Sequence, residues 1–187
     1  NKAYQKNIYT FTNFLSASDL DIFYSMLPDI SHIPYEIFGG RDGCDRVMIR
    51  FGSEDTTGYD LPFPITILQI TPLMDKFSDE LSHRDVLGSL MNLGIEREMT
   101  GDIIMKASSR SGIRNTAYVF CVSSIADYIS ENLTRIKHTS VRCIPCPDSD
   151  LPDITSTLEE CQCIAASERI DAVIAAVTKL SRSQTVI

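Results

Sequence analysis

The chain has 187 residues, of which 43% are hydrophobic and 22% are charged, and these proportions exclude a wholly disordered chain, a collagen-like repeat and a coiled coil. Its formal net charge of −8 argues against a nucleic-acid partner if the charge is spread evenly. The charge is instead uneven, at −6 over residues 1–81, +2 over 82–145, −6 over 146–168 and +2 over 169–187. A nucleic-acid function must therefore depend on two basic stretches.

The N-terminal region, residues 1–62, has the pattern of one helix followed by a β-hairpin. Ser16 and Asp19 form a capping box, in which a hydroxyl and an acid three residues apart accept the free amides of a helix start. Apolar residues recur at helical spacing up to Pro28, where we expect the helix to end. The runs 33–38 and 46–51 are extended, and the glycines between them predict a hairpin. Residues 52–62 are expected to be a linker.

The middle region, residues 63–146, alternates strand and helix patterns. Two further capping boxes, Ser82 to Asp85 and Ser124 to Asp127, each predict a helix start. The expected strands are 65–70, 102–106, 117–122 and 140–144. The order is β-α-β-β-α-β, which predicts an α+β fold of the ferredoxin-like kind (an alpha-beta plait), with both helices on one face of the sheet.

The C-terminal part is expected to begin with an acidic linker over residues 147–166, in which 159–166 has the pattern of a short strand. Residues 167–187 have the pattern of a helical domain that the sequence contains only in part. A helix is predicted over 170–177, and Ser181 to Gln184 has the pattern of a further helix start.

This C-terminal pattern resembles the small RNA-binding domain named after the fourth small-subunit ribosomal protein. The resemblance depends on an Arg-x-Asp helix, Arg169 to Asp171, and on Ser181, Arg182 and Ser183 at a helix start. Guanidinium groups beside a helix N-terminus form a good phosphate site. The alternative is two amphipathic helices with ordinary solvated charges.

A longer block resembles the YlmH-type bacterial RNA-binding proteins. The segments that carry this resemblance are Leu81–Asp85, Leu87–Leu90, Leu93–Ile95, Arg97–Glu98 and Gly101–Ile103, with a looser hairpin match at Gly39, Gly40, Gly43 and Arg46. The resemblance implies a cytosolic protein without enzymatic activity. It also implies action on the large ribosomal subunit and its bound tRNA during rescue of stalled translation.

From these patterns we expect two groups of RNA-binding residues. The first group, in the C-terminal part, is Arg169, Lys179, Ser181, Arg182 and Ser183. The second group lies at the two ends of the middle helix and is His83, Arg84 and Arg97. Both groups would hold phosphates through charge-assisted hydrogen bonds.

Tyr118 and Phe120 alternate with Val119 and Cys121, so the two aromatic rings share one face of the strand 117–122. If that face is open, the rings could stack on bases, as in RNA-recognition sheets. The alternative is that both rings pack beneath the neighbouring domain.

Motifs of catalysis and metal binding are weak in this sequence. His83, Arg84 and Asp85 spell the kinase catalytic-loop triplet, but position 90, which a kinase needs as Asn, is Leu90. The lone histidines His32 and His138 are predicted to be surface residues.

Six cysteines, in a chain whose start lacks the pattern of a secretion signal, indicate a reducing cytosol and a cytoplasmic location. The pair Cys143 and Cys146 has zinc-ligand spacing, whereas Cys161 and Cys163 are too close to complete a tetrahedral site. We therefore predict no metal and no cofactor. The sequence does not begin with Met, so we expect further residues upstream.

The function that these patterns favour is binding of structured RNA, ribosomal RNA with tRNA, without catalysis and without a membrane or small-molecule partner. One alternative is an RNA-modifying enzyme of the pseudouridine synthase kind, which needs a catalytic Asp in an Arg-Leu-Asp type motif. The pairs Arg41–Asp42 and Arg84–Asp85 match that motif poorly. A second alternative is a protein-interaction module that uses the acidic N-terminal half as its docking surface.

Overall fold

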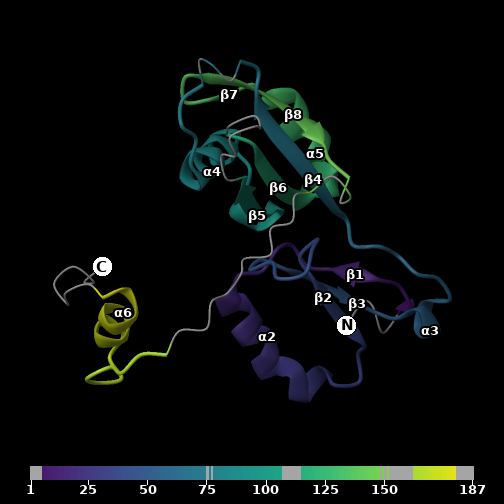
Figure 1. Cartoon of the computed structure of the whole chain (residues 1–187). Coiled ribbons are helices and arrows are strands. Elements are labelled where there is room, and N and C mark those ends of the chain that lie inside the picture. The colour runs from purple at the N-terminus through teal and green to yellow at the C-terminus, as the bar shows by residue number, and fades with distance from the viewer. Residues whose placement is uncertain are drawn as a thin grey trace. The chain divides into compact units, whose positions relative to one another are not determined.

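The computed structural model describes residues 6–74, 76, 78–106, 115–147, 149, 151 and 162–179 (Figure 1). The chain divides into two compact units, residues 1–153 and 154–187, and each is described by itself. Helices and antiparallel sheets make this an α+β fold, as predicted. No helix within the described ranges is both long and apolar enough to cross a membrane.

A small three-stranded sheet and one long helix form the N-terminal part of the first unit. The sheet has the antiparallel order β1 (Thr10–Phe11), β3 (Met48–Phe51), β2 (Tyr35–Phe38), so the predicted hairpin of β2 and β3 is confirmed. Helix α2 (Ala17–Ile30) begins at the predicted capping box. It packs on this sheet through Phe23, whose ring centroid lies 5.0 Å from that of Tyr35.

The larger sheet has the strand order β5-β6-β4-β8-β7 and is antiparallel throughout. Its strands are β4 (Ile65–Pro72), β5 (Thr100–Met105), β6 (Ala117–Val122), β7 (Arg135–Ile136) and β8 (Thr139–Pro145). Helix α4 (His83–Asn92) and the short 3-10 helix η2 (Arg97–Met99) connect β4 to β5, and α5 (Ser123–Asn132) follows β6 directly.

Both long helices of this part pack on the same face of the larger sheet. Val86 and Leu90 of α4 and Ile129 of α5 are fully buried in one core with strand residues such as Leu68 and Val119. Burial of one such side chain contributes about 1.5–3 kcal/mol to the hydrophobic stabilisation. The prediction that both helices lie on one face is confirmed.

The opposite face of the sheet is covered in part by the N-terminal region. Phe14 and Met48 are almost fully buried there against Tyr118, Phe120 and Ile67 of the sheet. The two sheets of the first unit thus share a second apolar core. This core covers one part of the second face of the larger sheet and leaves the rest of that face uncovered.

Several predicted boundaries differ from the structure. The third capping box is wrong, because α5 begins at Ser123 with Val122 as its N-cap residue and no side-chain cap. Thr66 reaches this turn from the adjacent strand and donates a hydrogen bond from Oγ1 to Ser123 Oγ at 2.8 Å. Pro28 does not end α2 but lies inside its last turn, where the missing N–H of proline costs one hydrogen bond.

The expected linker 52–62 contains a four-residue helix, α3 (Glu54–Thr57), and is fastened to the small sheet. Arg50 of β3 donates from Nη1 to Asp60 Oδ1 at 2.8 Å and also to the carbonyl of Leu61. The structure therefore uses this stretch as a packed connection.

Helix α6 (Ile170–Thr178) is the regular element described in the second unit, and it confirms the helix expected there. Residues 162–166 are not in a strand, and the rest of the strand expected over 159–166 lies outside the described residues. The helix start expected at Ser181 also lies outside them.

Candidate functional site

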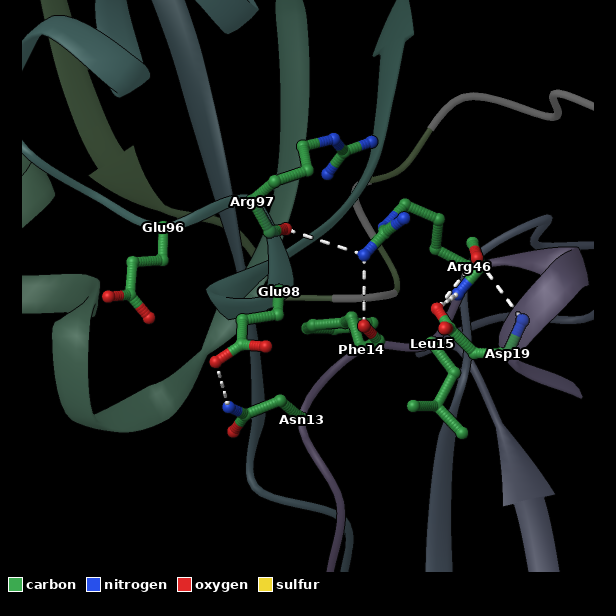
Figure 2. A pocket seen from close by; sticks show the side chains of 9 residues that line it. Asn13, Phe14, Leu15, Asp19, Arg46, Glu96, Arg97 and Glu98 are labelled. Carbon is green, nitrogen blue, oxygen red and sulfur yellow. Dashed lines mark hydrogen bonds between the residues drawn. The ribbon is translucent and has the colours of Figure 1, made fainter. Parts of the chain in front are cut away.

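The guanidinium of Arg46 lies where the N-terminal hairpin meets the larger sheet, and it donates hydrogen bonds to main-chain carbonyls of three different segments. Figure 2 shows those to Phe14 and Arg97. Its Nε donates to the carbonyl of Thr100 at 3.1 Å, and its Nη2 donates to those of Phe14 at 2.9 Å and Arg97 at 3.5 Å. A guanidinium offers five N–H donors in a planar fork, which suits it to such a junction. Arg46 therefore joins the hairpin to η2 and β5.

Asp102 of β5 makes the reciprocal contact to the same loop. Its carboxylate accepts the backbone N–H of Asp45 at 2.7 Å and that of Arg46 at 3.1 Å. Hydrogen bonds to an ionised acceptor are about twice as strong as neutral ones. The guanidinium of Arg46 and the carboxylate of Asp102, which come from opposite sides of the junction, thus hold the hairpin loop on the sheet.

Arg97, an expected phosphate ligand, also contacts main-chain oxygens at this junction. Its Nη1 donates to the carbonyl of Thr100 at 2.8 Å, to Thr100 Oγ1 at 2.7 Å and to the carbonyl of Gly101 at 3.0 Å. Burial, and secondly the positive charge of Arg46, lower the pKa of the Arg97 guanidinium below its ordinary value. These contacts give Arg97 a structural role at the start of β5.

A pocket of about 520 Å³ opens beside these arginines. Its lining includes the carboxylates of Asp19, Glu96 and Glu98, of which Glu98 accepts a hydrogen bond from Asn13 at 3.1 Å (Figure 2). Three carboxylates repel a phosphate, and the Arg46 guanidinium is already bound to carbonyls. The electrostatics of this pocket therefore do not suit an RNA backbone.

His83 and Arg84 are exposed in the first turn of α4. The helix spans ten residues, so this turn lies about 15 Å from the end that leads to Arg97. The structure therefore separates the second group of expected RNA ligands into two places. His83 and Arg84 remain together, whereas Arg97 joins Arg46 at the junction.

The carboxylate of Asp85, in the capping box beside His83, forms an ion pair with Lys137. Asp85 accepts the amide of Ser82 at 2.9 Å, and Lys137 Nζ lies 2.7 Å from its Oδ2. The hydrogen bond from Lys137, followed by those from Ser82, lowers the pKa of Asp85 to about 2. Asp85, the Asp of the kinase-like triplet, is therefore a helix-capping residue.

The stacking interpretation of Tyr118 and Phe120 is corrected by their burial. Tyr118 is 2% exposed and Phe120 is fully buried, both beneath the N-terminal region. The Tyr118 hydroxyl accepts a hydrogen bond from Gln69 Nε2 at 3.2 Å. The alternative that both rings pack beneath the neighbouring domain is what the structure shows.

In the second unit, Arg169 is the N-cap residue of α6, and its Nε donates to Asp171 Oδ1 at 3.0 Å. Lys179 follows the other end of this nine-residue helix and is exposed, in a left-handed conformation with a φ of 57°. The helix length separates the two cations by about 14 Å. Ser181, Arg182 and Ser183 lie outside the described residues.

Cys143 of β8 and Cys146, which follows the end of β8, contact opposite sides of the sheet. Cys143 is buried in the core beneath the helices, and Cys146 packs on the core of the other face. Burial raises the pKa of Cys143 to about 11 and that of Cys121 to about 12. Cys163 is exposed in the second unit.

Sequence reasoning missed one cationic surface, which we call the open strip. It is the part of the larger sheet's second face that the N-terminal region leaves uncovered, and it comprises Gln69, Thr71, Arg135, Ser140, Arg142 and Ile144. The alternation of side chains along β8 does predict that Arg142 lies on the other face of the sheet from the buried Val141 and Cys143. The sequence gives no signal of which part of that face stays open.

The comparisons with known proteins agree with this fold. Residues 60–150 match a family model described as "Putative RNA-binding domain in YlmH". The match covers the whole larger sheet, so this part of the chain is similar to that domain.

Two relatives extend the similarity beyond that domain. The chain is 27% identical over 179 residues to the ribosome-associated protein quality control protein P2 of Bacillus subtilis (strain 168), covering 94% of this chain. It spans 65% of that relative, slightly less than two thirds of its length. The solved structure of the cell division protein YlmH from Streptococcus pneumoniae shares the fold with a TM-score of 0.59 at 18% identity, over 79% of this chain and 84% of that chain. The resemblance to the YlmH-type RNA-binding proteins is confirmed.

Proposed function

We propose that this protein binds structured RNA and acts on the ribosome without catalysing a reaction. The observation that carries the proposal is the match of residues 60–150 to the YlmH RNA-binding domain model. The similarity to a ribosome-associated quality control protein supports the proposal that this protein binds RNA of the ribosome.

The more specific form of the proposal is binding to ribosomal RNA and tRNA on the large subunit, during rescue of stalled translation in the cytoplasm. The name of the Bacillus subtilis relative supports the quality-control role. In this form, Arg169, Lys179, Ser181, Arg182 and Ser183 hold phosphates in the C-terminal part. The exposure of Arg169 and Lys179 supports their share of this role.

The same proposal treats residues 63–146 as a ferredoxin-like domain between an N-terminal domain, 1–62, and an acidic linker. The order β5-β6-β4-β8, antiparallel throughout, supports this assignment. The packing of α4 and α5 on one face of that sheet supports it as well. His83 and Arg84 are then exposed side chains at one end of a helix of the RNA-binding domain.

Co-sedimentation of the 187-residue chain with separated small and large ribosomal subunits tests the proposal. We expect binding to the large subunit that weakens steeply as salt rises, because phosphate contacts release counterions. Addition of tRNA to the subunit should strengthen the binding. Absence of binding to either subunit, and to isolated ribosomal RNA at low salt, would contradict the proposal and favour a protein-interaction module.

An assay for pseudouridine separates the enzymatic alternative. Ribosomal RNA incubated with the protein at equimolar concentration should show no new pseudouridine, while a known pseudouridine synthase serves as positive control. New pseudouridine in the presence of this chain would contradict the non-catalytic part of the proposal.

A further inference from the structure

The open strip lies on the larger sheet at the end away from the covered part of the same face. The register aligns Thr71 with Arg142 and Gln69 with Ile144 across β4 and β8, and Arg135 with Ser140 across β7 and β8. Residues directly opposite on neighbouring strands share a face. All six strip residues therefore lie on the face opposite to α4 and α5.

Four of the six side chains of the strip are exposed to a partner, and Gln69 and Thr71 are half-buried. Arg135, Ser140, Arg142 and Ile144 are exposed, with Ile144 at 44%, and the covered part begins at Tyr118, which is 2% exposed. The hydrogen bond from Gln69 to the Tyr118 hydroxyl marks the boundary between the two parts. The N-terminal region thus covers one part of the face and leaves the strip exposed.

The charge of the strip is opposite in sign to that of the chain. Two of its six residues are arginines and none is acidic, although the chain as a whole has a formal charge of −8. Arg142 is the diagonal neighbour of Arg135 across the antiparallel pair β7 and β8, because Arg135 faces Ser140. Such positions are about 7–8 Å apart, and the two long side chains can contact neighbouring phosphates of one strand.

We propose that the open strip binds the phosphate backbone of RNA, with Arg135 and Arg142 as the phosphate ligands. This inference rests on the proposed function and names the surface that performs it. Thr71 and Ser140 supply neutral hydrogen-bonding groups beside Arg142 and Arg135, Gln69 supplies another beside Ile144, and Ile144 supplies an apolar contact for ribose or a base edge. Because the strip contains no aromatic ring, it binds RNA without the base stacking that other RNA-recognition sheets use.

Two properties of the binding follow from this chemistry. Affinity through the strip depends on salt, since each phosphate contact on a single strand contributes a slope of about 0.7. Affinity depends little on base sequence, since phosphate contacts carry no direct sequence information. An aromatic platform would instead gain affinity from each stacked base.

The test compares variants of the 187-residue chain for binding to a short RNA hairpin with a single-stranded loop, over a series of salt concentrations. We expect Arg135→Ala with Arg142→Ala to weaken binding at least about tenfold, since each lost contact is charge-assisted. The salt slope should fall by about 1.4, for two lost contacts. Arg142→Lys keeps the charge and should keep the slope.

Lys6→Ala is the control, because it removes one exposed positive charge from the N-terminal region. We expect it to leave affinity and slope unchanged. Unchanged thermal melting of the double variant shows that the fold is intact, as expected for exposed arginines.

The outcomes separate the inference from the proposed function. If the unaltered chain does not bind the RNA hairpin or ribosomal RNA, the proposed function fails, and the inference fails with it. If the unaltered chain binds and the double variant behaves like Lys6→Ala, only the inference is overturned. A loss confined to His83→Ala and Arg84→Ala would also overturn it and place the RNA at the start of α4.

Discussion

Arg46 and Asp102 are 56 residues apart in the sequence, and the backbone N–H of Arg46 donates to the Asp102 carboxylate at 3.1 Å. The Arg46 side chain extends past this contact to the carbonyls of Phe14 and Thr100. This arrangement holds the hairpin loop and the N-terminal segment on the first strand residues of β5. It holds the N-terminal region over one part of a sheet face, and so determines which residues of that face stay exposed.

Arg46→Ala should lower the free energy of unfolding by about 1.5–3 kcal/mol, because it removes charge-assisted hydrogen bonds to half-buried carbonyls. Urea denaturation followed by tyrosine fluorescence measures this change. Arg135→Ala is the matched control, since Arg135 is exposed and its loss should change stability by less than about 0.5 kcal/mol. Equal stability of the two variants would show that the junction does not depend on Arg46.

Replacing Gly101 or Gly88 by alanine should change the stability of the fold in opposite directions. A Cβ at Gly101 would lie 2.6 Å from Phe14 Cε1 and 3.0 Å from Phe120 Cβ, whereas a Cβ at Gly88 meets no atom within 4 Å. Gly101→Ala should destabilise the fold by about 1–3 kcal/mol through overpacking. Gly88→Ala, in the exposed part of α4, should stabilise it by about 0.8–1 kcal/mol. Thermal melting measures both, and a Gly101→Ala variant as stable as the unaltered chain would contradict the packing of Phe14 on β5.

Stability should depend on pH through Asp85, whose pKa falls from 3.8 to about 2 in the folded chain. A carboxylate with a lowered pKa stabilises the fold above about pH 4 and loses this contribution as the pH falls toward 2. Asp85→Asn should therefore be less stable than the unaltered chain at neutral pH, and the difference should shrink between pH 4 and 2.

Denaturation over this pH range, with Lys137→Ala as the partner variant, checks the expectation. Both variants lose the same ion pair, so both should show a reduced pH dependence. A difference between Asp85→Asn and the unaltered chain that stays constant from pH 7 to 2 would exclude the ion pair as its cause.

Arg182→Ala should weaken binding of the 187-residue chain to ribosomal subunits about tenfold or more, since a charge-assisted contact is worth about 1.5–3 kcal/mol. The salt slope should fall by about one counterion. Affinity measurements across a salt series check this, with Arg182→Lys as the variant that retains the charge. Parallel slopes and equal affinities would remove Arg182 from the binding site.

Local sequence signals predicted the helix starts at Ser16 and Ser82, where both capping boxes form with their expected partners. A capping box is a contact within four residues, so tertiary structure has little opportunity to override it. Ser124 carries the same pattern but lies within α5, because the chain turns into the helix directly from the end of β6.

Alternation correctly predicted that Tyr118 and Phe120 share a strand face, and it could not predict what covers that face. The cover comes from Phe14 and Met48, more than 60 residues earlier in the chain. The same limit hid the open strip, because Arg142 becomes a candidate ligand only once the uncovered part of the sheet is known. The role of Arg97 was also hidden, since two of its three acceptors are main-chain oxygens.

Cys44 of the hairpin loop packs on the covered face of the sheet, and burial, followed by the negative charge of Asp102, raises its pKa to about 11. A protonated, shielded thiol reacts slowly with an alkylating reagent and becomes reactive only when its surroundings open. The alkylation rate of Cys44 therefore reports detachment of the hairpin, while that of Cys121, which is buried in the core beneath the helices, reports opening of that core. Comparing the two alkylation rates with and without RNA shows whether the hairpin stays packed on the sheet when RNA is present.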